Sequence, residues 1–292
     1  MSRPDKNHVS QNDANGGHPP GQMPLRSAPG DRVSRLVQAL EDSVIPRLVE
    51  AHRAMPQAAG VALQAHALPG PDGVKHFVDL VMSPDEQPMY AYIAALLADG
   101  LSIESIYLDV LAGAAHLLGD MWVDDRVDFT EVTVAVGRLQ HIMRELSPAF
   151  GAEVEHPSGG RRVLLAPAPG EQHTFGVSMV SEFFLRAGWE VTFGEAGSRT
   201  NAIDMVEHDW FDVVGFSLGS ALRLDELKKS IAEIRQRSCN HDIGVMVGGP
   251  IFLLNPEYVA DVGADGTAID GLQAPVSAEA MVAERSRRLV RD

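Results

Sequence analysis

The sequence predicts a small helical bundle followed by an open, parallel, doubly wound α/β domain. Two patterns predict this fold class. Between residues 76 and 150, apolar side chains recur at helical spacing almost throughout, which favours several helices packed against one another. After residue 160, short apolar runs alternate with helical segments, and that alternation is typical of βαβ units around a parallel sheet. In such sheets, ligands bind at the carboxyl ends of the strands.

The chain before the bundle divides into three segments. Residues 1–30 are rich in Pro, Gly, Asn and Gln and lack an apolar period, so we expect a disordered tail. Residues 31–53 show helical spacing, and a Pro- and Gly-rich connector covers roughly residues 56–74.

The helical half contains two long amphipathic stretches. Ser102 starts the first, "SIESIYLDVLAGAAHLLGDMW", and a polar turn, "VDDRVD", separates it from the second, "FTEVTVAVGRLQHIMREL". We expect three or four helices here, with residues 31–150 forming a helical segment and bundle and residues 151–160 forming a linker.

The α/β half, residues 161–292, is expected to hold five strands and five helices. Strands are expected at 162–167, 189–193, 212–217, 243–247 and near 265–269. Helices are expected at about 175–187, 199–208, 223–237, 255–262 and 274–288. This order predicts a five-stranded parallel sheet with its ligand site at the strands' carboxyl ends.

Composition excludes several classes of protein. The formal net charge of −16 argues against a protein that binds the phosphate backbone of nucleic acid, which needs a local excess of Lys and Arg. A single cysteine, Cys239, excludes an intrachain disulfide framework and a cysteine-based metal cluster. No apolar run approaches the ~18 residues of a membrane span, and the N-terminus lacks a signal peptide's apolar core. We expect a soluble, cytoplasmic protein.

Three loops are predicted to meet at the carboxyl edge of the sheet. His173 lies in the first of them, and a lone loop histidine is more often a surface or capping residue than a ligand. The loop lacks the G-x-G-x-x-G and G-K-[ST] patterns of phosphate-binding loops, and the chain has no G-x-S-x-G nucleophile elbow. The candidate ligand-binding residues are Glu171, Gln172, His173, Thr174, Phe175 and Gly176, then Ser217, Leu218 and Gly219, then Gly248, Gly249 and Pro250.

Taken together, the three loops resemble the cobalamin-binding signature D-x-H-x-x-G … S-x-L … G-G in order, spacing and placement at strand ends. Glu171 stands at the Asp position and Gly219 at the Leu position. The resemblance implies a flavodoxin-like (Rossmann-like) fold and a cobalamin cofactor. It further implies that His173 replaces the cofactor's own benzimidazole as lower cobalt ligand, while the displaced nucleotide tail enters a slot beside the sheet.

The residue types suit these implied roles. Neutral imidazole is a good ligand for a borderline transition metal, and its second nitrogen needs an acceptor, which Glu171 can supply. Glycine at 176, 248 and 249 allows the buried tail to approach the backbone closely. The Ser217 hydroxyl can donate to the benzimidazole nitrogen.

The helical half resembles the cap that covers the upper corrin face in cobalamin-dependent regulators and methyl-transfer proteins. "LLGDMW" followed by "VDF" resembles the cap's Gly-x-x-Trp element and implies that Trp122 lies over the ring; the alternative is a tryptophan of the bundle core. Val132 and Thr133 stand where several relatives carry Glu and His. We therefore expect the hydroxo or aquo form of cobalamin to be preferred, with His8, His18 or His141 as candidate upper ligands.

The amino-acid sequence of the cap resembles that of the PpaA/AerR family of photosynthesis-gene regulators in purple bacteria. The resemblance extends over roughly residues 75–290. That resemblance implies a light-responsive, cobalamin-binding photoreceptor without catalytic residues. It further implies an antirepressor that acts on a DNA-binding repressor and does not itself bind DNA sequence-specifically. The alternatives are a corrinoid methyl-carrier subunit and a haem-binding redox sensor on the same fold. A cobalamin-dependent mutase would need a substrate barrel of ~250 residues that the sequence lacks.

Overall fold

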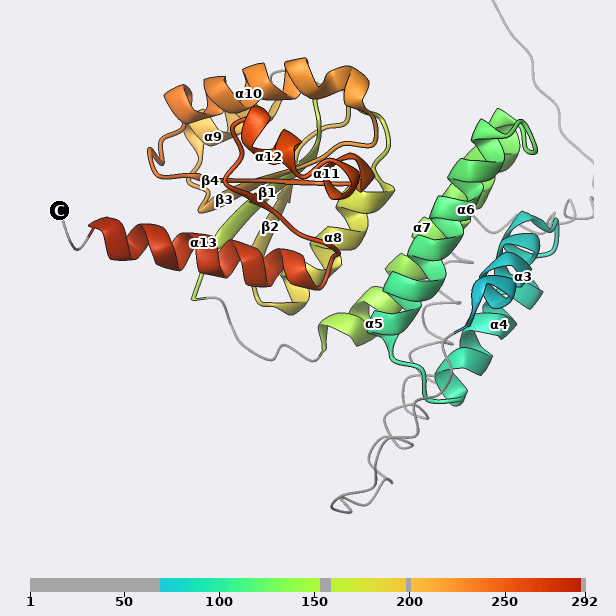
Figure 1. Ribbon diagram of the computed structural model, residues 1–292. Helices are drawn as coiled ribbons and strands as arrows, with labels where there is room; N and C mark the ends of the chain where they lie inside the picture. The colour runs from blue at the N-terminus through green and yellow to red at the C-terminus, as the bar shows by residue number, and fades with distance from the viewer. Residues whose placement is uncertain (1–68, 153–158, 198–200, 290–292) are drawn as a thin grey trace, which may run out of the picture. The chain divides into compact units, whose positions relative to one another are not determined.

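The computed structural model describes residues 69–152, 159–197 and 201–289 (Figure 1). The predicted tail at 1–30 and the predicted helix at 31–53 lie outside the described residues, as do most of the connector and of the linker. So do the tail histidines proposed above as upper ligands.

The first described part is helical, as the sequence predicts. Its elements are α3 (Pro71–Met82), α4 (Gln87–Ala98), α5 (Ile103–Ser105), a π-helical segment (Ile106–Leu111), α6 (Ala112–Val123) and α7 (Phe129–Gly151). The helix expected over 102–122 is thus one continuous helical run with a π-helical turn inside it. One boundary prediction was wrong, because α3 begins inside the predicted connector. Pro71 suits the first helical position, where no backbone donor is needed.

The helices of this bundle are fixed by local capping and by a shared core. Asp128 and Glu131 form a reciprocal capping box at the start of α7. The buried Tyr107 hydroxyl donates to the Met143 carbonyl at 2.7 Å, which ties the π-helical segment to α7. Fully buried apolar residues from the helices form one core: Phe77, Val81, Met89, Ile106, Val110, Leu111, Ala114, Leu118, Ala135 and Leu139.

One helical run, Ile103–Val123, is long and apolar enough to cross a membrane by length and composition alone, contrary to the expectation of no such run. A third of its most apolar window is buried (33%). One stripe of the run, including Ile106, Val110, Ala114 and Leu118, is fully buried in the bundle core. The core helix of a soluble bundle can pass the same test of length and composition.

The second described part is a five-stranded sheet with all strands parallel, which confirms the predicted fold class. The strands run in the order β2-β1-β3-β4-β5. Their bounds are Arg162–Pro167 (β1), Glu190–Phe193 (β2), Val213–Ser217 (β3), Gly244–Gly248 (β4) and Gly266–Thr267 (β5). Pro167 pairs with Ser217, and Ser217 pairs with Gly248, so the three central strands end level with one another. The loops that follow them therefore start from the same edge.

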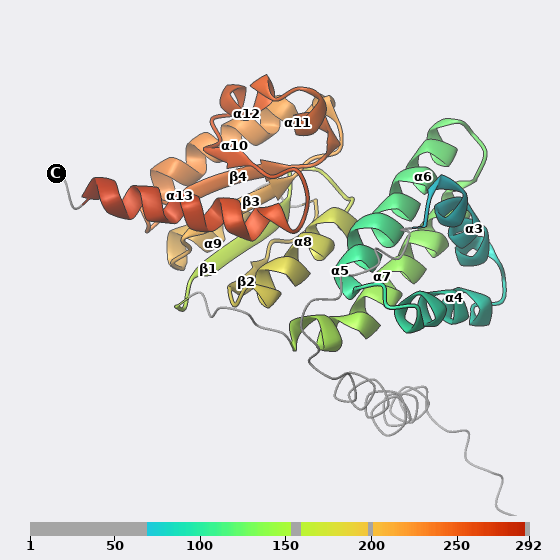
Figure 2. The ribbon, with the colours of Figure 1, turned by 60° about the horizontal axis from the view of Figure 1, so that its bottom comes forward.

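Helices cover both faces of the sheet (Figures 1 and 2). α8 (Phe175–Arg186) and α13 (Gln273–Leu289) pack on one face. α9 (Asn201–His208), α10 (Leu224–Arg237), α11 (Pro250–Leu254) and α12 (Glu257–Asp261) pack on the other. Neighbouring residues of β1 enter opposite cores, with Leu164 on the α10 face and Leu165 on the α8 face. The short helix α11 was not predicted.

Helix α8 belongs to both parts of the fold. Its Met179 and Phe183 are buried in the core of the helical bundle, while its Val177 and Phe184 pack on the sheet. At the end of α8, Arg186 pairs with Glu104 at 2.9 Å. Because α8 starts directly after the histidine loop, this helix connects the loop to the bundle.

Candidate functional site

The loop that carries His173 leaves the sheet at the end of β1 and is tied down along its length. The Ala168 amide donates to the Ser217 carbonyl at 2.8 Å, and the Glu171 amide donates to the Ala168 carbonyl at 2.8 Å. Gly170 adopts a φ of +75°, in the left-handed region that favours glycine. These contacts give the loop a tight turn immediately before Glu171.

Glu171 and His173 form the contact that the sequence predicts. His173 Nδ1 lies 2.5 Å from Glu171 Oε1, and the same oxygen accepts from the backbone amides of Gln172 at 2.9 Å and His173 at 3.1 Å. The Glu171 side chain is 8% exposed, whereas the His173 side chain is 92% exposed. A buried carboxylate thus orients an imidazole that projects into solvent.

The hydrogen bonds at Glu171 decide its charge and the histidine's tautomer. Burial alone would raise the pKa of the Glu171 carboxyl. The bonds from the backbone and side chain of His173 and from the Gln172 backbone outweigh that effect and hold the pKa below its ordinary value. An ionised carboxylate fixes the proton on Nδ1, so that Nε2, on the far side of the ring, keeps its lone pair for a metal.

The glutamate also reaches a second loop. Its Oε2 accepts from the Gly219 amide at 3.4 Å, in the loop that follows β3. Although the cobalamin-binding signature has Asp at this position, the Glu171 of this chain still contacts His173. The additional methylene allows one carboxylate to join the first loop to the second.

Small residues on the α8 face of the sheet leave room beside this edge. Ser217 and Gly248 end their strands on that face, and Gly176 lies opposite them in the first turn of α8. A Cβ atom built on Gly176 would lie 3.5 Å from the Ser217 hydroxyl oxygen, and one built on Gly248 would meet nothing within 4 Å. Gly248 thus borders open space that any larger residue would fill, as a slot for a cofactor tail requires.

Gly249 is a glycine for a local reason. Its φ is +111°, and a Cβ there would lie 2.3 Å from the Leu218 carbonyl oxygen. The backbone of the β4 loop therefore packs directly on the backbone of the β3 loop, which also bonds to it through the Leu218 amide and the Gly248 carbonyl at 3.0 Å. The sequence alone did not separate this structural role from one in tail binding.

The other predicted residues of the three loops differ in exposure. Gln172 and Pro250 are exposed. The Thr174 hydroxyl accepts from the Gln140 amide of α7 at 3.3 Å. Phe175 packs on the bundle core. Leu218 is fully buried on the α10 face, so its side chain anchors the loop in the core on that face of the sheet.

The predicted cap residues lie at the end of the bundle where α6 meets α7. Trp122 is 47% exposed and contacts Phe129, itself exposed, edge-to-face at a centroid distance of 6.3 Å. This exposure does not fit a tryptophan of the bundle core. Val132 is half-buried on α7, while the Thr133 hydroxyl donates to the Phe129 carbonyl at 2.7 Å. The Nε2 of His141 lies 3.1 Å from Glu145 Oε1.

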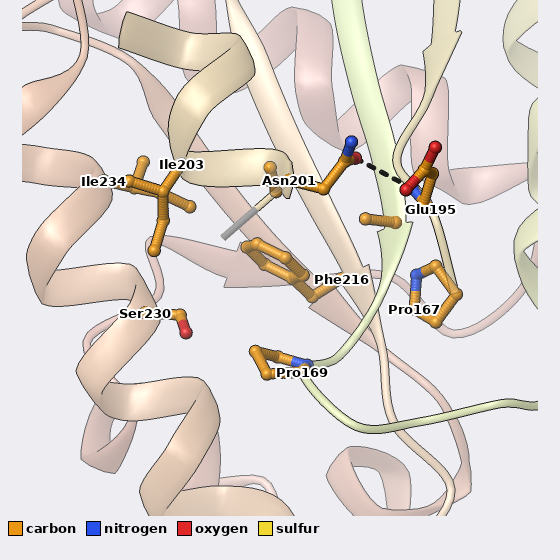
Figure 3. Close-up of a pocket in the computed structure, with 10 residues that line it drawn as sticks. Pro167, Pro169, Glu195, Asn201, Ile203, Phe216, Ser230 and Ile234 are labelled. Carbon is orange, nitrogen blue, oxygen red and sulfur yellow. Dashed lines mark hydrogen bonds between the residues drawn. The ribbon is translucent and has the colours of Figure 1, made fainter. Parts of the chain in front are cut away.

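A small pocket that the sequence did not predict lies on the opposite face of the sheet (Figure 3). Ala166 and Phe216 of the sheet line it, together with Ser230 and Ile234 of α10. At its rim, the Asn201 side-chain oxygen accepts from the Glu195 amide at 2.8 Å. None of the residues proposed above for cofactor binding lines this pocket, which lies on the face of the sheet opposite Ser217 and Gly248.

The donor set limits which metal the site suits. Among the residues that the structure describes, no three or more His, Cys, Asp or Glu side chains gather to hold a metal ion. A single exposed imidazole at the edge where Gly248 borders open space suits a metal whose remaining ligands belong to an organic macrocycle. The residues present therefore fit a corrinoid with a displaced tail.

Replacement of Glu171 by Gln should weaken corrinoid binding by about 10- to 100-fold, the usual effect of losing the partner that orients a metal-bound histidine. Gln keeps the size of the side chain but loses the charge that holds the proton on Nδ1. The affinity is measured by absorbance titration, and Glu171→Asp should fall between Gln and the wild type. Equal affinity of the Gln variant and the wild type would contradict this role.

Comparison with known proteins finds similar families and folds. Residues 161–276 match the family described as the B12 binding domain. A protein of Rhodobacter capsulatus, described as an uncharacterized 20.5 kDa protein in the bchF-crtJ intergenic region, is 29% identical over 163 residues, which are 56% of this chain and 84% of that protein. The solved structure of the Methanosarcina barkeri monomethylamine corrinoid protein superposes with a TM-score of 0.60 at 15% identity, covering 70% of this chain and 96% of that one. The last likeness shows a shared fold.

Proposed function

We propose that the protein is a cobalamin-binding, light-responsive regulator that relieves repression of photosynthesis genes through a DNA-binding repressor. The match of residues 161–276 to the B12 binding domain supports the cofactor. The observation that carries the cofactor part is the Glu171–His173 pair at 2.5 Å beside the open slot at Gly248. The regulatory part is supported by the relative whose gene lies between bchF and crtJ.

The roles of the residues follow from their placement. The His173 imidazole would bind cobalt from below through Nε2, and Glu171 would hold the ring in the required tautomer. Gly176, Ser217 and Gly248 would line the slot for the nucleotide tail, and Trp122 would lie over the upper face. Bound cobalamin would supply a light-absorbing metal centre with an exchangeable upper ligand. We propose the hydroxo or aquo form as the preferred one.

Helix α8 offers a route from the cofactor to a partner. It begins at the histidine loop, and its Phe183 is buried in the bundle core, where it contacts Tyr107 and Phe150 edge-to-face. A displacement of the loop on loading would repack this core and alter the surface of the bundle. By thermodynamic linkage, a repressor that prefers the loaded form must in turn tighten cobalamin binding.

The effect on transcription should pass through a protein partner, because the net charge of −16 opposes direct binding to DNA. Footprinting of the repressor on a pigment-gene promoter, with apo and cobalamin-loaded protein in light and dark, tests this. We expect one loaded form to change repressor occupancy while the protein alone leaves no footprint. Unaltered occupancy under all conditions would refute the antirepressor role.

The second candidate is a corrinoid methyl carrier, an enzyme subunit that passes methyl groups between partner proteins. It is favoured by the superposition on 96% of the Methanosarcina barkeri corrinoid protein. Incubation of the loaded protein with a corrinoid methyltransferase and a labelled methyl donor separates the two. Methyl transfer together with unchanged repressor occupancy would favour the carrier.

A further inference from the structure

We infer that Leu222 is a contact platform for the underside of the corrin macrocycle, on the side of His173 away from the tail slot. The inference rests on the proposed binding of cobalamin and adds a residue outside all three signature loops. It assigns to the corrin ring itself an apolar contact that does not depend on the nucleotide tail.

The exposure of Leu222 is the first observation. Its side chain is 93% exposed, the highest fraction among the large apolar residues that the structure describes. It belongs to a short 3₁₀ turn, Ala221–Arg223, which starts three residues after Leu218 in the loop that follows β3. The Ser220 hydroxyl accepts from the Leu222 amide at 3.4 Å and helps to hold the turn. An aliphatic side chain so exposed at a ligand-binding edge gains most from a ligand that covers it.

The turn is also held against the histidine loop. The Gly219 amide donates to Glu171 Oε2, the carboxylate that orients His173. The Arg223 guanidinium lies against Gly170, so closely that a Cβ on that glycine would stand 2.1 Å from Nη1. The turn that carries Leu222 is therefore tied to the histidine loop by a contact before Leu222 and another after it. Because the turn is already held in place, a ligand would lose little binding free energy in ordering it.

The direction in which the turn leads is the third observation. It continues into α10, which covers the face of the sheet opposite α8. The slot residues Ser217 and Gly248 lie on the α8 face. A planar macrocycle bound by the exposed imidazole would extend to both sides of the sheet edge. Its tail would enter the open space at Gly248 on the α8 side, and its ring would contact the turn that carries Leu222 on the α10 side.

The test compares cobalamin with cobinamide, a corrinoid that lacks the nucleotide tail. Leu222→Ala removes most of the apolar area that this one side chain would bury against the ring. Both corrinoids should therefore bind about tenfold more weakly to this variant of the full chain. Gly248→Val should weaken cobalamin and spare cobinamide, because only cobalamin has a tail to clash with valine. Leu185→Ala serves as the matched control, since Leu185 is also exposed (43%) but lies at the far end of α8.

The outcomes are distinct. Equal loss of both corrinoids in Leu222→Ala, with none in Leu185→Ala, supports the platform. Unchanged affinity for both corrinoids overturns it, and a simultaneous loss of repressor binding would reassign Leu222 to the partner surface. A loss confined to cobalamin also overturns it, because the contact would then belong to the tail. A wild-type protein that binds neither corrinoid would refute the proposed cofactor as well as the platform.

Discussion

His173→Ala should reduce cobalamin affinity by more than about 100-fold, beyond the usual effect of changing a residue that only orients a ligand. The variant loses the lower nitrogen ligand while the slot remains. The side chain is 92% exposed, so its removal leaves no cavity and should not change the melting temperature. Retention of cobalamin on a desalting column and the visible spectrum of the loaded protein measure the effect.

His208→Ala is the matched control for this prediction. His208 is likewise exposed, and its Nδ1 bonds to the Asp204 carbonyl at 2.7 Å on α9, away from the three loops. Free imidazole should restore part of the wild-type spectrum to His173→Ala and have no effect on the control. If His173→Ala keeps both the wild-type retention and the wild-type spectrum, His173 is not the cobalt ligand.

Gly248→Val should weaken cobalamin by about 10- to 100-fold, the equivalent of ~1–3 kcal/mol of overpacking in a filled site. No protein atom lies within 4 Å of a Cβ at this position, so the free protein has room for the start of the side chain. The tail of the cofactor would then have to compete with valine for the same space. Absorbance titration gives the affinity, and circular dichroism with a thermal melt gives the fold and its stability.

The neighbouring glycine provides a contrast. Gly249→Ala places a Cβ 2.3 Å from the Leu218 carbonyl oxygen at a φ of +111°, so it should lower the melting temperature even without cofactor. Gly248→Ala should have a smaller effect on cobalamin than valine and none on stability. If Gly248→Val binds cobalamin as tightly as the wild type, the tail runs elsewhere.

The sheet and its edge could be predicted because their pattern is local. Each strand is a short apolar run between helical segments, and β1 was predicted with its observed bounds, Arg162–Pro167. Parallel strands that end level must bring the loops that follow them to one edge. For this reason the sequence alone placed His173 and Gly248 at the same site. The contact of Glu171 with His173 was expected from the resemblance, because the second nitrogen of a metal-bound imidazole needs an acceptor.

Other features could not be predicted because they depend on contacts between distant segments. The π-helical turn at Ile106–Leu111 and the short helix α11 have no distinct signal in the apolar period. Exposure of Trp122 could not be separated from burial, because helical spacing does not say which neighbour covers a face. The pocket in Figure 3 is formed by side chains from β1, β3, α9 and α10, which only the fold brings together.

The sequence by itself predicted the fold class and the sheet edge at which the three loops meet, because both depend on residue type and short spacing. Its resemblance to the cobalamin-binding signature is what singled out His173 at that edge. Only the tertiary structure decided that the Glu171 carboxylate joins two loops, that Gly248 faces open space while Gly249 faces a carbonyl oxygen, and that Leu222 is exposed in the turn after β3. Those properties depend on which atoms of other segments approach a residue, and close packing between segments far apart in the chain sets that approach.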